Sequence, residues 1–284
     1  MKKRMNLITK VITFIALILS IILVVPVFSV AGAETNAADA GIGVIPEYRV
    51  ALTTKVYPSE NAQGLLVIEP EDYTVREVRA LKASGYKVLA YLSIGSVSDE
   101  REYYHSLEPY TLGDLEDWPH EKYLDVANEA VQRWAIDRGK ELINDMGFDG
   151  LWVDNIDVYE EYPSEKAFDG ITKILEILDM HGYIMVNGGI VYVLQSIDCG
   201  YDVIDGITQE EVFSLVTDYD GKGEFERQEA DQRVEYMEYI SAALDAGMDA
   251  FLLEYTRSEG LMAEIRKYCE QKGAGYYISD DVDL

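Results

Sequence analysis

Basic residues are few in this sequence. The 284 residues include 24 lysines and arginines against 52 aspartates and glutamates, which gives a formal net charge of −28 at pH 7. A nucleic-acid-binding protein needs a basic face to displace the counterions of the phosphate backbone, so no nucleic-acid partner is expected. A cationic partner suits this charge better.

Histidine and cysteine are also scarce. The three histidines, His105, His120 and His181, form no H-E-x-x-H motif and no close pair, which argues against a histidine-based zinc site. The two cysteines, Cys199 and Cys269, have no histidine beside them in sequence that would activate a thiol nucleophile. They allow one disulfide at most, and the sequence leaves open whether it forms.

Several well-known motifs are missing. The sequence has no G-x-S-x-G motif, so a serine nucleophile of that type is not expected. Neither a G-x-G-x-x-G motif nor a phosphate-binding loop follows the first predicted strand, which disfavours an open nucleotide-binding sheet. The chain is nevertheless 48% hydrophobic and holds 21 tyrosines, so it has ample material for a folded core.

The first 33 residues have the layout of a secretory signal peptide. Four basic residues lie at or before Lys10, an apolar run covers 11–30, and the small triplet Ala31-Gly32-Ala33 ends it. A run of this length also fits an uncleaved membrane anchor. The triplet and the polar residues after it favour cleavage after Ala33. We therefore expect a secreted or cell-surface protein without stable membrane insertion, and a short linker over 34–48.

Eight apolar or β-branched runs predict eight strands in the remaining chain, which is about as long as one (β/α)₈ barrel. The runs cover 49–54, 64–69, 87–93, 150–157, 183–187, 204–212, 250–256 and 275–279. Apolar residues at helical spacing lie between most of them, within 75–81, 127–135, 168–178, 234–244 and 261–268. The expected fold class is α/β, with a single (β/α)₈ TIM barrel over 49–284.

One connection of the predicted barrel is unusually long. The polar and aromatic segment 94–123 would lie over the end of the barrel where substrates bind. It contains Trp118, and exposed rings of this kind commonly stack on sugars or cations. Trp134 lies on a helical stripe and Trp152 in a strand, so these two are expected in the core, with Trp152 filling the barrel beneath Asp154.

Acidic residues end five of the eight predicted strands, and the carboxyl ends of barrel strands carry the chemistry of this fold. Acids often start loops because they cap the next helix, but Asp154 and Glu210 lie inside strand-like runs. Paired carboxylates at such an end are what glycoside hydrolysis requires, since one protonates the leaving oxygen and the other attacks the sugar or activates water. Repulsion between them raises one pKa and keeps that group protonated near neutral pH.

A second acidic segment, 218–229, has the spacing of a calcium-binding loop. Lys222 occupies a position that would have to donate an oxygen, and no helix is predicted before the loop. An acidic surface loop is therefore the favoured interpretation, and no metal site or cofactor is predicted.

Several short blocks occur in order along nearly the whole chain after the leader. The most specific is G-F-D-G-L-W-V-D-N-I-D over 147–157. The others are A-Y-L-S-I-G over 90–95, W-P-H-E over 118–121, V-N-G over 186–188, E-E-V-F over 210–213 and E-Y-T over 254–256. In these blocks the sequence resembles glycoside hydrolase family 114, the endo-α-1,4-polygalactosaminidases and related secreted bacterial proteins with a (β/α)₈ fold.

The resemblance implies that Asp154 and Glu210 are the catalytic pair, and we favour Glu210 as general acid/base and Asp154 as nucleophile. The motifs and the strand ends together predict further substrate-binding residues. These are Glu69, Tyr91, Ser93, Asn155, Asp157, Asn187, Glu254, Asp280 and Trp118.

The implied substrate also offers a reason for the acidity, because deacetylated polygalactosamine is a polycation that an acidic cleft attracts. Solubility of a secreted protein is the other explanation. We expect a monomeric secreted glycosidase that acts on amino-sugar polymers. Two alternatives stay open: a non-catalytic cell-surface module that holds a cationic glycan, and a metal-dependent hydrolase that uses Asp154, Asp157 and Glu210 as ligands.

Overall fold

The computed structural model of the protein describes residues 47–60, 62–115, 118–219 and 221–284. The predicted leader over 1–33 and nearly all of the predicted linker over 34–48 lie outside these residues. Within the described ranges, no helix is long and apolar enough to cross a bilayer.

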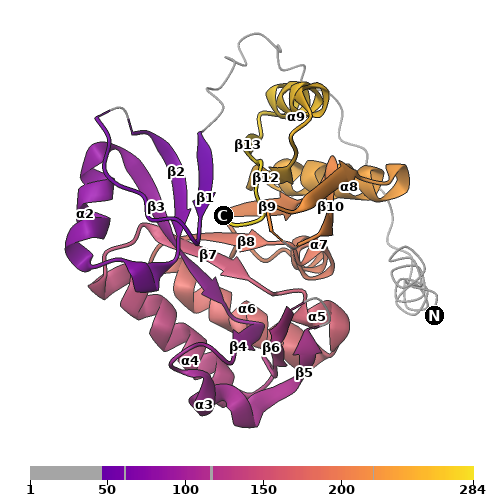
Figure 1. The fold of residues 1–284 in the computed structure, drawn as a ribbon. Coiled ribbons are helices and arrows are strands. Elements are labelled where there is room, and N and C mark those ends of the chain that lie inside the picture. Colours follow the sequence, from indigo (N-terminus) through magenta and orange to yellow (C-terminus); the bar gives the residue numbers. More distant parts are fainter. Residues whose placement is uncertain (1–46, 61, 116–117, 220) are drawn as a thin grey trace, which may run out of the picture. The chain divides into compact units, whose positions relative to one another are not determined.

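Eight parallel strands form a nearly closed barrel, and each overlaps one of the eight predicted runs (Figure 1). In order of pairing they are β1 (Tyr48–Ala51), β2 (Gly64–Ile68), β3 (Tyr86–Ser93), β7 (Gly150–Asp154), β8 (Tyr183–Asn187), β9 (Gly206–Glu210), β12 (Asp249–Tyr255) and β13 (Gly275–Ser279). A bridge between Glu47 and Tyr276 joins the first strand region to the last. The predicted (β/α)₈ fold is confirmed.

Alternate residues of each strand face the barrel interior, because side chains of a strand point to opposite faces in turn. The interior core includes Trp152 on β7 and Met185 on β8, and Thr208 of β9 lies between them. Trp152 is 1% exposed and donates its indole N–H to Thr208 Oγ1 at 2.9 Å, so the predicted packing role of this residue is confirmed. Two residues further along these strands, Asp154, Asn187 and Glu210 share the inward face at the carboxyl ends, which we call the mouth.

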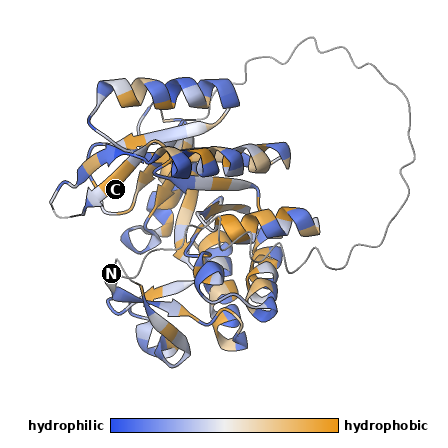
Figure 2. Cartoon of the chain, turned by 90° about the vertical axis from the view of Figure 1, so that its right-hand side faces the viewer, coloured by the Kyte–Doolittle hydropathy of each residue, from blue (hydrophilic) through white to orange (hydrophobic). Residues whose placement is uncertain are grey.

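In the described ranges, six long helices cover the outside of the barrel. They are α2 (Val75–Ser84), α4 (Glu129–Lys140), α6 (Glu165–Asp179), α7 (Ile190–Cys199), α8 (Ala230–Asp245) and α9 (Glu259–Lys272). Their apolar stripes pack on the outward residues of the strands and form the larger hydrophobic cluster. Figure 2 shows hydrophobic residues in the strands and many hydrophilic ones along the helices. The stripes predicted five of these helices, whereas α7 was not predicted.

The long connection after β3 folds into a small sheet of its own. Strands β4 (Ser96–Ser98), β6 (Trp118–Leu124) and β5 (Thr111–Leu115) pair antiparallel with β6 in the middle, and the short helix α3 (Tyr104–Leu107) packs on them. Figure 1 shows this sheet beside the short helix α5 (Val158–Glu161). The connection was predicted as an excursion, but its strands were not.

A second excursion follows β9. Strands β10 (Ser214–Asp218) and β11 (Glu224–Arg227) pair antiparallel, so the segment with calcium-loop spacing is the turn and second strand of a hairpin. Phe225 of this hairpin packs with Val282 and Leu284 of the C-terminal tail in the inner cluster. The hairpin and the tail therefore complete the core on the β12–β13 side.

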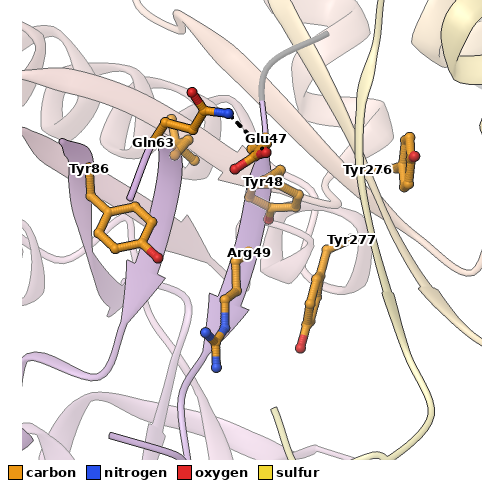
Figure 3. A pocket seen from close by; sticks show the side chains of 8 residues that line it. Glu47, Tyr48, Arg49, Gln63, Tyr86, Tyr276 and Tyr277 are labelled. Carbon is orange, nitrogen blue, oxygen red and sulfur yellow. Dashed lines mark hydrogen bonds between the residues drawn. The ribbon is translucent and has the colours of Figure 1, made fainter. Parts of the chain in front are cut away.

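A hollow of about 370 Å³ opens at the opposite end of the barrel, where the strands begin (Figure 3). It is lined by Glu47, Tyr48, Arg49, Gln63, Leu65, Tyr86, Tyr276 and Tyr277. Gln63 donates to the Glu47 carboxylate at 3.0 Å across it. Since the chemistry of this fold belongs at the carboxyl ends of the strands, this hollow is not the candidate active site.

Candidate active site

Two carboxylates at the mouth share one amide nitrogen. Asn187, the last residue of β8, donates through Nδ2 to Asp154 Oδ1 at 3.1 Å and to Glu210 Oε1 at 2.8 Å. Asp154 ends β7 and Glu210 ends β9, the strands on either side of β8. Because both oxygens contact the same nitrogen, they lie within about 6 Å of each other. The structure thus brings together the two acids and the asparagine that the sequence predicted.

Asp154 is held by donors on both oxygens. Tyr91 donates its hydroxyl to Oδ2 at 3.0 Å, and Asn155 donates its amide to the same oxygen at 3.2 Å. Burial raises the pKa of Asp154, while the hydrogen bonds from Asn187 and Tyr91 act in the opposite direction. This carboxylate is therefore fixed in one orientation, with donors that favour its ionised form.

Glu210 has a different environment. Its Oε2 accepts the hydroxyl of Tyr255 at 2.8 Å, while Oε1 accepts from Asn187. Burial raises the pKa of Glu210 to about 7, and the nearby charge of Asp154 adds to this effect. A carboxyl group with such a pKa is protonated in a large fraction of molecules at neutral pH, which suits a general acid.

Each of these acids is followed by a residue with a left-handed backbone. Asn155 has φ 59° and Glu211 has φ 58°, and they are the two non-glycine residues with positive φ in the described chain. Such a conformation is costly outside glycine and is concentrated at functional sites. The left-handed residue ends β7 directly after Asp154 and β9 directly after Glu210, so both strands are shorter than the sequence predicted.

A chain of contacts joins the predicted residue Glu69 to the pair. Glu69, at the end of β2, forms an ion pair with Arg101 at 2.7 Å. The Arg101 guanidinium lies 5.8 Å from the centre of the Tyr91 ring, and Tyr91 bonds Asp154. Glu69 therefore acts on the site through Arg101 and Tyr91.

Ser93 and Asp157 lie next to the pair in the structure. Ser93, 9% exposed, accepts the Asn155 amide at 3.1 Å and donates to the backbone oxygen of Ser96, so it fixes Asn155 and the turn after β3. Asp157 precedes helix α5, and burial together with the charge of Asp154 raises the pKa of Asp157 to about 7.

Two predicted substrate-binding residues lie elsewhere. Glu254 has the opposite parity from the inward residues of β12 and is 0% exposed. Its carboxylate accepts the backbone N–H groups of Phe213 and Ser214 and the Ser214 hydroxyl, which anchors the loop after β9. Asp280 is exposed just after β13. The structure gives neither residue a hydrogen bond to Asp154 or Glu210 among the described contacts.

An aromatic pair joins the two excursions. Trp118 of β6 and Tyr219, after β10, are 53% and 51% exposed, and their ring centres lie 5.8 Å apart at an angle of 60°. The excursions follow the third and sixth strands of the eight in the barrel, so this contact links loops from nearly opposite sides of the mouth. The Tyr219 hydroxyl also bonds Glu211, the neighbour of Glu210.

Three site residues were not predicted. Tyr255 follows the acid Glu254 on β12, and strict alternation of the strand would have pointed to it. Arg101 and Glu121 belong to the excursion after β3, whose fold the sequence pattern does not reveal, and the charge of Glu121 raises the pKa of Asp154. In the described part of the chain, no three histidine, cysteine or acidic side chains group as they would around a metal ion.

The chain is similar in structure to known glycoside hydrolases. The glycoside hydrolase domain of PelA from Pseudomonas aeruginosa matches with a TM-score of 0.71 at 18% identity, over 84% of this chain and 96% of that domain. Ega3 from Aspergillus fumigatus, solved in complex with galactosamine, matches at 0.65 and 16% identity, over 89% and 97%. TtGalA, an alpha-galactosidase from Thermus thermophilus, matches at 0.54 and 13% identity, over 82% and 58%. At these identities the likeness shows a shared fold.

The sequence itself decides the family. No curated protein matches the chain in sequence. The model of the glycoside hydrolase family GH114 matches residues 31–280, which include the whole barrel and every candidate site residue. The protein therefore belongs to glycoside hydrolase family GH114.

Proposed function

We propose that the protein is an endo-acting glycosidase of α-1,4-linked galactosamine polymers, in which Glu210 is the general acid/base and Asp154 is the nucleophile. The observation that carries this proposal is the Asn187 amide, which contacts both carboxylates and sets their spacing. Two acids of unlike environment at one mouth are the parts that glycoside hydrolysis needs.

In the first step, protonated Glu210 donates its proton to the glycosidic oxygen while Asp154 attacks the anomeric carbon. The bond to the leaving sugar breaks, and a covalent glycosyl ester forms on Asp154. In the second step, Glu210, now ionised, takes a proton from water, and the water oxygen displaces Asp154 from the anomeric carbon.

The carboxylate spacing favours retention of configuration. Retaining enzymes hold their two carboxyl groups about 5–5.5 Å apart, whereas inverting enzymes keep about 6.5–9.5 Å to admit a water. Asp154 Oδ1 and Glu210 Oε1 contact one nitrogen at 3.1 and 2.8 Å, so they lie within about 6 Å of each other, which is closer than the inverting range.

The charge and the rim aromatics support a cationic polymer as substrate. The chain carries a formal charge of −28, and Asp157, Glu121 and Glu211 lie near the catalytic pair. The negative electrostatic field of these groups raises the local concentration of a polycation at the mouth. Trp118 and Tyr219 offer exposed rings on which sugars stack. Ega3 was solved with galactosamine, which is in line with the same substrate class.

The proposal includes a monomeric protein without a cofactor that works outside the cytoplasm. The basic and apolar leader over 1–33 supports export. A secreted or cell-surface location would expose the enzyme to extracellular polysaccharide, its proposed partner.

The test is release of reducing ends from deacetylated polygalactosamine by three variants. Asp154→Asn and Glu210→Gln are expected to lose nearly all activity, since each removes a group that takes part in bond breaking. Asp114→Asn removes the charge of an exposed side chain in β5, so it is the matched control and is expected to keep full activity. Full activity of both site variants would overturn the proposal. Loss of activity on chelation would favour a metal-dependent hydrolase instead.

A further inference from the structure

Glu121 is an acidic residue of the small sheet, and its charge acts on the catalytic residue Asp154. It belongs to β6 and pairs in register with Ser98 of β4, which begins three residues after the end of β3. Its Oε2 accepts the Ser96 hydroxyl at 2.7 Å. The side chain is only partly buried, so it stays accessible to a bound molecule.

A continuous hydrogen-bond network connects Glu121 with Asp154. Ser96 Oγ lies 2.9 Å from Ser93 Oγ, which accepts the Asn155 amide at 3.1 Å. The same amide reaches Asp154 Oδ2 at 3.2 Å. The negative charge of Glu121 also raises the pKa of Asp154 and of Tyr91, so it acts on the side of the site that holds the nucleophile.

Three neighbouring acids, Glu69, Glu160 and Glu211, have stronger partners than Glu121 has. Glu69 is neutralised by Arg101, and Glu160 and Glu211 accept backbone N–H groups of α7 and β10. Glu121 accepts one neutral hydroxyl, and no cation of the described chain pairs with it. A carboxylate without a paired cation is free to form a charge-assisted hydrogen bond with a cationic group of a ligand.

We propose that Glu121 is the residue that selects a free amino sugar, by binding the C2 ammonium group of the unit attacked by Asp154. This inference rests on the proposed glycosidase function. The C2 nitrogen is two bonds from the anomeric carbon, and Glu121 is linked to the nucleophile that attacks this carbon through Ser96, Ser93 and Asn155. An N-acetyl group has no positive charge and is larger, so Glu121 gives it no comparable bond.

The test compares kcat and KM on two matched α-1,4-linked galactosamine oligomers, one fully deacetylated and one fully N-acetylated. Glu121→Gln keeps the shape and an acceptor for Ser96 but removes the charge. We expect kcat/KM for the deacetylated oligomer to fall roughly 10- to 100-fold, mainly through KM, as for loss of a hydrogen bond to a charged group. The value for the acetylated oligomer is expected to stay the same, which also shows that the variant is folded.

Two further variants sharpen the result. Glu121→Asp is expected to keep part of the preference for the deacetylated oligomer that Glu121→Gln loses. Asp114→Asn in β5, with 80% of its side chain exposed, is expected to leave this preference unchanged. If Glu121→Gln changes kcat/KM equally for both oligomers, or changes it for neither, the assignment is overturned. If the wild type cleaves neither oligomer, the proposed function fails, and calorimetric binding of the deacetylated oligomer to wild type and Glu121→Gln still decides the role of Glu121.

Discussion

Removal of the Tyr255 hydroxyl tests how the protein tunes its general acid. Tyr255 donates to Glu210 Oε2 at 2.8 Å and lowers the pKa of Glu210, which burial raises to about 7. A hydrogen bond to a charged group contributes about 1.5–3 kcal/mol, and one pH unit corresponds to about 1.4 kcal/mol. Tyr255→Phe therefore raises the pKa of Glu210 by roughly one to two pH units.

The sign of the effect in kinetics follows from the role of Glu210. The general acid works when protonated, so kcat/KM falls as pH rises through the pKa of Glu210. In Tyr255→Phe this alkaline limb is expected to move to higher pH, by roughly one to two units. The assay is a pH profile of kcat/KM on a galactosamine oligomer. Tyr277→Phe, the same change on neighbouring β13, serves as control because its ring lines the hollow at the other end of the barrel. An alkaline limb that stays in place, or moves to lower pH, would refute the reasoning.

Two further predictions concern the mouth and its support. Trp118→Ala removes one ring of the pair with Tyr219 and so one stacking contact with the substrate. In steady-state assays we expect KM for long polymer to rise about two- to tenfold, with little change in kcat. An unchanged KM would show that the pair does not bind substrate. Glu254→Gln places an amide against the backbone N–H groups of Phe213 and Ser214, so the free energy of unfolding in urea is expected to fall by about 1–3 kcal/mol. A stable Glu254→Gln protein with a raised KM would instead support the substrate contact that the sequence predicted.

The periodic parts of the sequence predicted the barrel well. Alternating runs located all eight strands, and apolar stripes located five of the six long helices, because these patterns follow from burial on one face. The same pattern located Asp154, Asn187 and Glu210 at strand ends, and the resemblance to the family implied that Asp154 and Glu210 are the catalytic pair.

The remaining features depend on contacts that no local pattern encodes. Glu254 was predicted from its position at a strand end, but parity turns it outward and brings Tyr255 to Glu210. Arg101 and Glu121 reach the mouth only because the excursion folds into a sheet and turns back on β3. The left-handed backbone at Asn155 and Glu211 ends two strands earlier than their apolar runs indicate. Long-range packing decides each of these features, so the sequence predicted the acids and their nearest neighbours on β3, β7 and β8 but not the contacts from β12 and the excursion.

The central claim is that Asp154 and Glu210 act as nucleophile and acid/base on one sugar. The most direct measurement is the anomeric configuration, by NMR, of the glycosyl azide formed from an activated α-linked aryl galactosaminide oligomer when azide rescues an alanine variant. Asp154→Ala is predicted to give the β-azide, because azide attacks from the face that the carboxylate leaves empty. Glu210→Ala is predicted to give the α-azide, because azide displaces the sugar from Asp154. The opposite pair of products, or an α-azide from both variants, would contradict the account.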